Sequence, residues 1–152
     1  MSRRADVVAY NPDGQIALLV EAKSRTGTSR SWATRMRRNM LAHGMVPNSQ
    51  FLLLALPDRF YLWKDAGNVP ELVEPTYELA AQPFLGPYYE KAHLSPAEVT
   101  GQSFELIVAS WLNELIRAGI PRGVPEEEQK TLLDSGLLDV LKGGSVAVEP
   151  PA

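Results

Sequence analysis

The stretch Asp6-Val-Val-Ala-Tyr-Asn-Pro-Asp-Gly-Gln-Ile-Ala-Leu-Leu-Val-Glu-Ala-Lys23 decides the fold of the N-terminal half of this chain. It predicts two apolar strands joined by a turn at 11–14, because proline presets φ and glycine tolerates left-handed backbone there. Asp6 opens the first strand, and Glu21 and Lys23 close the second. An unpaired carboxylate is costly to bury. Charges in such apolar strands are therefore expected to be exposed, paired or functional.

The register of this hairpin decides whether the two acidic residues meet. With a short loop at Asp13-Gly14, Asp6 lies directly opposite Glu21. With a loop that also includes Pro12, Asp6 lies opposite Val20 and points to the other face from Glu21. A second irregularity is then needed to bring the carboxylates together. The turn residues favour the longer loop and a shared site favours the shorter one, so both registers stay open.

The next elements predict a mixed sheet. A polar loop at 24–29 precedes a helix expected over 30–43, which carries apolar side chains at i, i+4 and i+8. The strands that complete this half are expected over 5–10, 15–23, 51–56 and 59–64. Two strands, a helix and two more strands in this order predict an α/β fold whose helical crossover is right-handed.

The second half of the chain is more weakly patterned. Prolines punctuate residues 65–100, where Tyr88-Tyr89 predicts the start of a short helix. An apolar stripe predicts a long helix over 98–118, and an acidic helix is expected over 125–142. We therefore expect a single domain over 1–142, with a motif-bearing core at 1–64 and a helical part at 65–142. Residues 143–152 are expected to form a flexible tail.

Composition narrows the class of protein. The 152 residues are 45% hydrophobic and include no cysteine, which excludes disulfides and thiolate metal sites. His43 and His93 lie too far apart to suggest a zinc site. The sequence shows neither a signal peptide nor a long apolar run, so a cytoplasmic protein with no membrane association is expected. Residues 1–64 hold ten Lys and Arg against four Asp and Glu, whereas residues 65–152 hold five against fourteen.

Oxygen ligands at the open end of the hairpin suggest a magnesium site. Mg²⁺ prefers hard oxygen ligands and keeps several waters, and Asp6, Glu21 and the carbonyl of Ala22 can supply such oxygens. Lys23 shares a strand face with Glu21 and can orient an attacking water or stabilise developing negative charge. The alternatives are that Asp6 only neutralises Arg3 and Arg4, and that Glu21 and Lys23 form an exposed ion pair.

The spacing of Asp6 and Glu21-Ala22-Lys23, followed by a helix, an apolar strand and the aromatic strand at 59–64, resembles the PD-(D/E)xK nuclease superfamily. The most similar group is the N-terminal nuclease domain of type I restriction enzyme motor subunits. The resemblance spans about residues 3–64. It implies a restriction-endonuclease-like mixed central sheet flanked by helices, a Mg²⁺ or Mn²⁺ ion held by Asp6 and Glu21, and a catalytic role for Lys23.

The sequence departs from that family at three points. Such nucleases usually carry a helix, often with another acidic residue, ahead of the first strand, and only five residues precede Asp6 here. The helix at 98–118 is a candidate to fill that place, with Glu98 or Glu105 as the substitute acid. Ala5 stands where proline is common. Residues 35–39 also lack the Gln-x-x-x-Tyr pattern of many relatives.

Basic residues after the motif suggest a surface for a nucleic-acid backbone. The candidates are Arg25, Arg30, Arg35, Arg37 and Arg38. The alternative is that these arginines only solvate one helix face.

These patterns predict a metal-dependent phosphodiesterase that hydrolyses the DNA backbone. The runner-up is a catalytically inactive nuclease-like module that binds nucleic acid or a protein partner. A third alternative is a subunit that completes its site as a homodimer or with a partner subunit.

Overall fold

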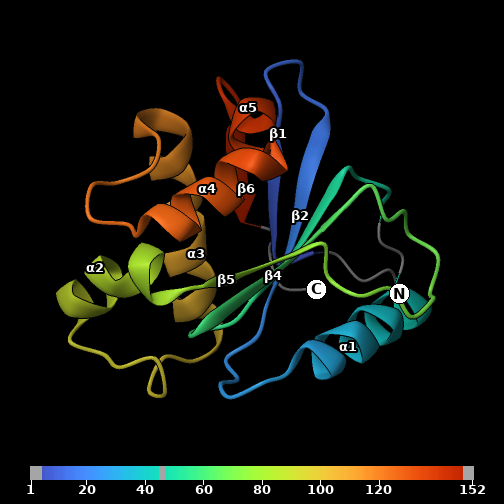
Figure 1. The fold of residues 1–152 in the computed structure, drawn as a ribbon, viewed down its shortest axis with the longest axis horizontal. Helices are drawn as coiled ribbons and strands as arrows, with labels where there is room; N and C mark the ends of the chain where they lie inside the picture. Colours follow the sequence, from blue (N-terminus) through green and yellow to red (C-terminus); the bar gives the residue numbers. More distant parts are fainter. Residues whose placement is uncertain (1–4, 45–46, 149–152) are drawn as a thin grey trace.

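The chain folds as a mixed α/β structure with one six-stranded sheet between two helical layers (Figure 1). The computed structural model describes residues 5–44 and 47–148. Its strands are β1 (Val7–Tyr10), β2 (Ile16–Ala22), β3 (Phe51–Ala55), β4 (Arg59–Lys64), β5 (Tyr77–Ala80) and β6 (Ser145–Val148). Its helices are α1 (Arg30–His43), α2 (Gln82–Ala92), α3 (Gly101–Ala118), α4 (Glu126–Ser135) and α5 (Leu137–Leu141).

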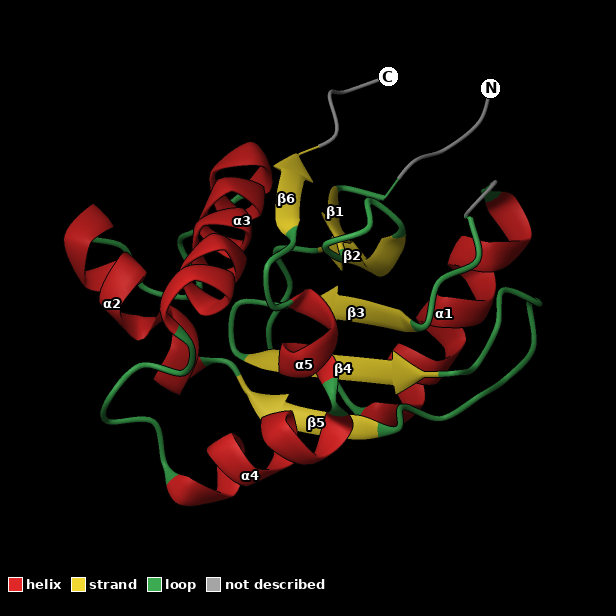
Figure 2. Cartoon of the chain, turned by 90° about the horizontal axis from the view of Figure 1, so that it is seen from above, coloured by secondary structure: helices red, strands yellow, loops and turns green. Residues whose placement is uncertain are grey.

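The sheet has the strand order β5-β4-β3-β2-β1-β6. Only β2 and β3 are parallel, and α1 is the crossover between them. The other neighbouring strands are antiparallel. A mixed sheet with a helical crossover is what the order of elements predicts. The carboxyl ends of β2 and β3 therefore lie together at one end of the sheet. Figure 2 shows β3 and β4 running in opposite directions.

The two faces of the sheet are packed unequally. The face toward α2, α3, α4 and α5 holds the main apolar core, in which Phe84 and Trp111 each stack on Phe60, with the three ring centroids 4.9–6.1 Å apart. The face toward α1 holds a smaller cluster that includes Ala33, Met40 and the strand residues around Tyr61. Figure 1 shows α1 alone on its side of the sheet.

The structure corrects the expected C-terminal tail. Residues 145–148 form β6, which pairs with β1 at the end of the sheet opposite β5. A Cβ atom on Gly144 would lie 1.9 Å from the carbonyl oxygen of Tyr10, so only glycine lets the chain approach β1 this closely. Gly144 lies in the tail that is expected to be flexible, but the close approach makes glycine a requirement for strand pairing. Residues 149–152 lie outside the described residues.

The helices of the second half also differ from expectation. The acidic helix expected over 125–142 is broken at Gly136, which has φ 81° and separates α4 from α5. The short helix expected near Tyr88 is the eleven-residue α2, which tolerates Pro87 inside it. β5 is absent from the sequence-based expectation, and the helix expected over 98–118 begins at Gly101. The predicted elements of residues 5–64 are confirmed to within two residues at each end.

Candidate active site at the open end of the hairpin

A bulge sets the register of the hairpin that carries the motif. The turn is the longer of the two alternatives, with the Asn11 N–H donating to the Gln15 carbonyl at 2.9 Å and Tyr10 paired with Ile16. The register then shifts by one residue, so that Ala9 pairs with Leu18 and Val7 with Val20. The second irregularity that the longer turn requires is therefore present. It leaves Asp6, which directly precedes β1, beside the carboxyl end of β2, where the Asp6 N–H donates to the Val20 carbonyl at 2.9 Å.

The carboxylate of Asp6, which directly precedes β1, contacts the backbone at the carboxyl end of β2. Its Oδ2 accepts a hydrogen bond of 2.8 Å from the Ala22 N–H, while the Lys23 N–H donates in the opposite direction to Ala55 of β3. The N–H and C=O of one strand residue point toward the same neighbouring strand. The carbonyl of Ala22 therefore points toward the side on which Asp6 lies.

Glu21 and Lys23 leave β2 on the face that α1 covers. Glu21 is buried and pairs in the parallel ladder with Leu54, a member of the cluster under α1. The Lys23 Nζ lies 3.6 Å from Glu21 Oε1, and the lysine side chain is about one-third exposed. Lys23 is therefore paired with a buried carboxylate and is still partly accessible to solvent.

A further acidic residue approaches Asp6 from α3. Burial raises the pKa of Glu105, and the nearby negative charge of Asp6 raises it further. Glu98 is instead engaged in its own turn, where it accepts a 2.8 Å hydrogen bond from the Ser95 N–H. That hydrogen bond lowers the pKa of Glu98. Of the two substitute acids, only Glu105 is electrostatically coupled to Asp6.

The oxygen donors at this end of the sheet can hold a hard cation only if water molecules complete its coordination shell. Within residues 5–44 and 47–148, no three Asp, Glu, His or Cys side chains are gathered closely enough to hold a metal ion. The Asp6 carboxylate, the Ala22 carbonyl and one further carboxylate are the oxygens available at this end of the sheet. Mg²⁺ commonly binds through one or two carboxylates and retains waters, so this set suits Mg²⁺ better than an ion that needs a full protein cage.

Arg37 is not available to a nucleic-acid backbone, contrary to the sequence-based expectation. It is fully buried, and its guanidinium donates to the carbonyls of Ala66, Gly67 and Glu71 at 3.1–3.2 Å. Burial lowers the pKa of Arg37, and the charge of Glu71 partly offsets that effect. The helix periodicity places Arg37 on the inner side of α1, where it ties the loop after β4 to the helix.

The other arginines lie around the exposed side of α1. Arg30 is held by Glu74 and by the carbonyl of Pro75, and Arg35 donates to Ser31 on the preceding turn. Arg25 precedes the helix and lies over the ring of Trp32, with its Cζ 5.2 Å from the ring centroid. Arg38 is partly exposed. No acidic residue occurs between Glu21 and Asp58, so the helix itself provides no acidic partner for these charges.

The residues that fix the loop after Lys23 are absent from the sequence-based expectation. The Gly27 N–H donates to Asp58 Oδ2 at 3.0 Å, and the Thr28 and Tyr61 hydroxyls lie 3.0 Å apart. Asp58 and Tyr61 belong to the β3–β4 hairpin, which is distant in sequence from the loop. The available signal was the parallel alignment of β2 with β3, which places their carboxyl ends side by side.

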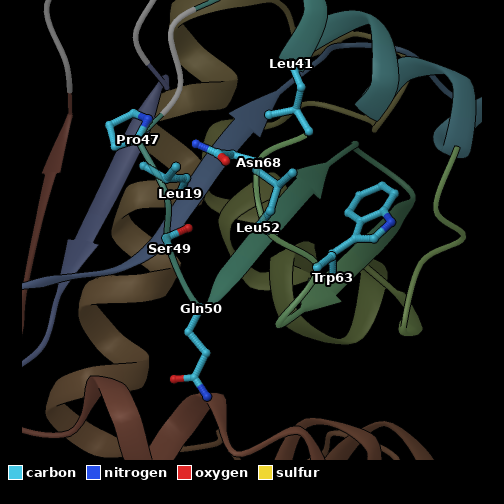
Figure 3. A pocket seen from close by; sticks show the side chains of 10 residues that line it. Leu19, Leu41, Pro47, Ser49, Gln50, Leu52, Trp63 and Asn68 are labelled. Atoms are coloured by element: carbon cyan, nitrogen blue, oxygen red, sulfur yellow. The ribbon is translucent and has the colours of Figure 1, made fainter. Parts of the chain in front are cut away.

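A small pocket elsewhere does not compete with this site. It lies beneath the loop after β4, between Leu19, Leu41, Leu52 and Trp63, and has room for about one water molecule (Figure 3). No residue that lines it is ionisable. Its Ser49 hydroxyl donates to the carbonyl of Phe51. The pocket therefore lacks the acid, base or nucleophile that catalysis requires.

Comparison with models of known protein families, with curated proteins and with solved structures gives no match. The resemblance to the nuclease superfamily therefore depends on the motif residues and their spacing. In the part of the chain that the structure describes, no helix has the length and apolarity needed to cross a membrane.

Proposed function

We propose that this protein is a Mg²⁺- or Mn²⁺-dependent phosphodiesterase that hydrolyses the DNA backbone at the open end of the β1–β2 hairpin. The observation that carries the proposal is the contact between the Asp6 carboxylate and the Ala22 N–H, on the strand that presents Glu21 and Lys23. It gathers an acid, a main-chain carbonyl and the Glu-x-Lys pair at one end of the sheet.

Asp6 and the Ala22 carbonyl are the proposed metal ligands, together with Glu21 or Glu105. The bound cation would polarise a phosphate oxygen and lower the pKa of a coordinated water. A cation would also relieve the repulsion between Asp6 and Glu105 that contributes to the raised pKa of Glu105.

Lys23 is proposed to orient the attacking water and to stabilise the negative charge that develops on the phosphate. Its ammonium is 3.6 Å from Glu21 and partly open to solvent, so it can face a substrate while Glu21 limits its movement. A fixed cation at this position stabilises the transition state more than the ground state, because negative charge grows there during the reaction.

The exposed side of α1 and the loop before it are the proposed backbone-binding surface. Arg25, Arg35 and Arg38 contribute positive charge, and Arg30 adds to it beside Glu74. Binding through backbone contacts carries little sequence information and weakens steeply with salt. The proposed activity is therefore sensitive to ionic strength and has little base preference.

The test compares cleavage of a labelled DNA by the wild type and by two motif variants, with Mg²⁺ or Mn²⁺. Glu21→Gln and Lys23→Met should each lower cleavage by about 100-fold or more, because the first removes a proposed metal ligand and the second removes the cation proposed to stabilise developing negative charge. Lys91→Met, at an exposed position of α2, is the matched control and should cleave normally. Circular dichroism verifies that every variant is folded.

Metal binding provides a second readout. Calorimetric titration with Mn²⁺ should give a binding isotherm for the wild type that Asp6→Asn weakens. Metal-dependent cleavage that survives both motif substitutions would contradict the assignment of the site.

The second candidate is a catalytically inactive module that binds nucleic acid through α1. It is favoured by one observation, namely that no three acidic side chains of the described residues form a ready ligand group. Such a module would bind DNA equally well with EDTA and with Mg²⁺ and would not cleave it at any metal concentration. Cleavage that appears only as protein concentration rises would instead indicate a site completed by a second copy.

A further inference from the structure

One hairpin fixes the loop that follows the motif lysine. The main-chain N–H of Lys23 donates to Ala55, that of Gly27 to the Asp58 carboxylate, and the Thr28 hydroxyl pairs with Tyr61. The three partners are spaced three residues apart along β3, its turn and β4. The intervening residues 24–26 include Arg25, which is exposed and lies over Trp32.

Asp58 differs from the other two anchors in being charged and incompletely satisfied. Its Oδ2 accepts from Gly27, whereas its Oδ1 is buried and has no hydrogen-bond partner. A buried oxygen without a partner is costly. The negative charge of Asp58 also raises the pKa of the nearby Tyr89, although burial is the larger cause.

The turn that carries Asp58 is held rigidly from the other side of the sheet. The Tyr89 hydroxyl donates to the Pro57 carbonyl at 2.9 Å, and the Ala81 N–H donates to the Asp58 carbonyl at 3.2 Å. The carboxylate is therefore presented from a fixed platform to a loop that is mostly exposed. A side chain on a rigid element positions a neighbouring loop more accurately than the loop can position itself.

We propose that Asp58 is a positioning residue that holds the loop from Lys23 to Gly27 in the shape that presents Arg25 to the substrate phosphate. The inference rests on the proposed function, because the positioned group is a contact to the DNA backbone. Gly27 has φ 69°, so its N–H reaches the carboxylate from a left-handed conformation that glycine adopts without strain.

The test measures KM and kcat for DNA cleavage in the wild type, Asp58→Ala and Asp58→Asn. Asp58→Ala should raise KM by about tenfold with kcat within about twofold, because Arg25 is misplaced while Lys23 keeps its own backbone anchor at Ala55. Asp58→Asn should restore KM, since its amide oxygen still accepts from Gly27. Asp134→Ala, at an exposed position of α4, is the matched control and should leave both constants unchanged.

Amide hydrogen exchange at Gly27 provides a readout that does not depend on activity. Protection at Gly27 should be lost in Asp58→Ala and retained in Asp58→Asn, while protection in β3 and β4 persists. If the wild type cleaves DNA and Asp58→Ala leaves KM unchanged, the inference is overturned and the proposed function stands. If the wild type neither binds nor cleaves DNA, the proposed function fails and the inference fails with it.

Discussion

The two faces of the sheet bury very different side chains. The face toward α2 and α3 is filled by apolar and aromatic residues, including the stack of Phe60, Phe84 and Trp111. The face toward α1 has fewer apolar residues and also buries two charged groups, Glu21 and Arg37. Apolar burial stabilises a fold, whereas buried charges rarely do. The difference indicates that the first face holds the fold together and that the second accommodates the candidate site.

The largest expected effect on stability lies in the aromatic stack. Trp111→Ala should lower the free energy of unfolding by about 3–5 kcal/mol, because it removes a fully packed ring and leaves a cavity. The same face offers a control in Leu106→Ala, at an exposed position of α3, which should change stability by less than about 0.5 kcal/mol. Urea denaturation measures both. Equal losses in the two variants would break the distinction between the core and the surface of this face.

Arg37 gives the matching test on the other face. Arg37→Ala should destabilise the protein by about 3 kcal/mol, because it removes a fully buried side chain and leaves three loop carbonyls without their shared donor. Arg35→Ala, two residues away and exposed, should cost less than about 0.5 kcal/mol. Thermal unfolding monitored by circular dichroism separates the two. If DNA affinity falls with Arg37→Ala and stability does not, the structural role assigned to Arg37 is wrong.

The pKa of Glu105, which burial and then the charge of Asp6 raise, predicts a pH dependence of stability. Because the pKa of Glu105 is raised on folding, the folded state holds its proton more tightly than the unfolded state. The favourable contribution is complete below the ordinary glutamate pKa and is lost as pH rises through the raised value. Glu105→Gln should therefore gain stability relative to the wild type as pH increases from 4 to 7, a range that spans the ordinary glutamate pKa of about 4.3.

Glu98 supplies the opposite control. Its pKa is lowered by its hydrogen bonds to Ser95, so its contribution is present above the ordinary glutamate pKa and is lost as pH falls. Glu98→Gln should accordingly lose stability relative to the wild type as pH rises. Urea titrations at several pH values measure both variants. Parallel pH profiles for Glu105→Gln and Glu98→Gln would show that the pKa of Glu105 is not raised on folding.

The smallest expected effect concerns the backbone-binding surface. Arg35→Ala should weaken DNA binding modestly and reduce the slope of log affinity against log salt by about 1, because one phosphate contact is lost. Arg122→Ala, an exposed arginine far along the chain from α1, should leave the slope unchanged. Fluorescence anisotropy at several salt concentrations measures the slope. An unchanged slope for Arg35→Ala would support the view that the arginines of α1 only solvate the helix.

The first half of the fold could be predicted because its signals are local. Proline and glycine define the turn at 11–14, and the apolar run of β2 is long enough to mark a strand by itself. The second half could not be predicted equally well. β5 and β6 are four residues each and become strands by pairing with β4 and β1. Such pairing depends on residues distant in sequence, as does the role of Gly144.

Some features of the candidate site could likewise be predicted from the sequence, and others could not. The sequence by itself determined that Glu21 and Lys23 share a strand face, because side chains alternate along a strand. Only the tertiary structure decided the bulge that lets the Asp6 carboxylate reach the Ala22 N–H, the approach of Glu105 from α3, and the burial of Arg37. The physical reason is that alternation is a property of one strand, whereas register, packing and burial depend on which distant elements the chain places beside it.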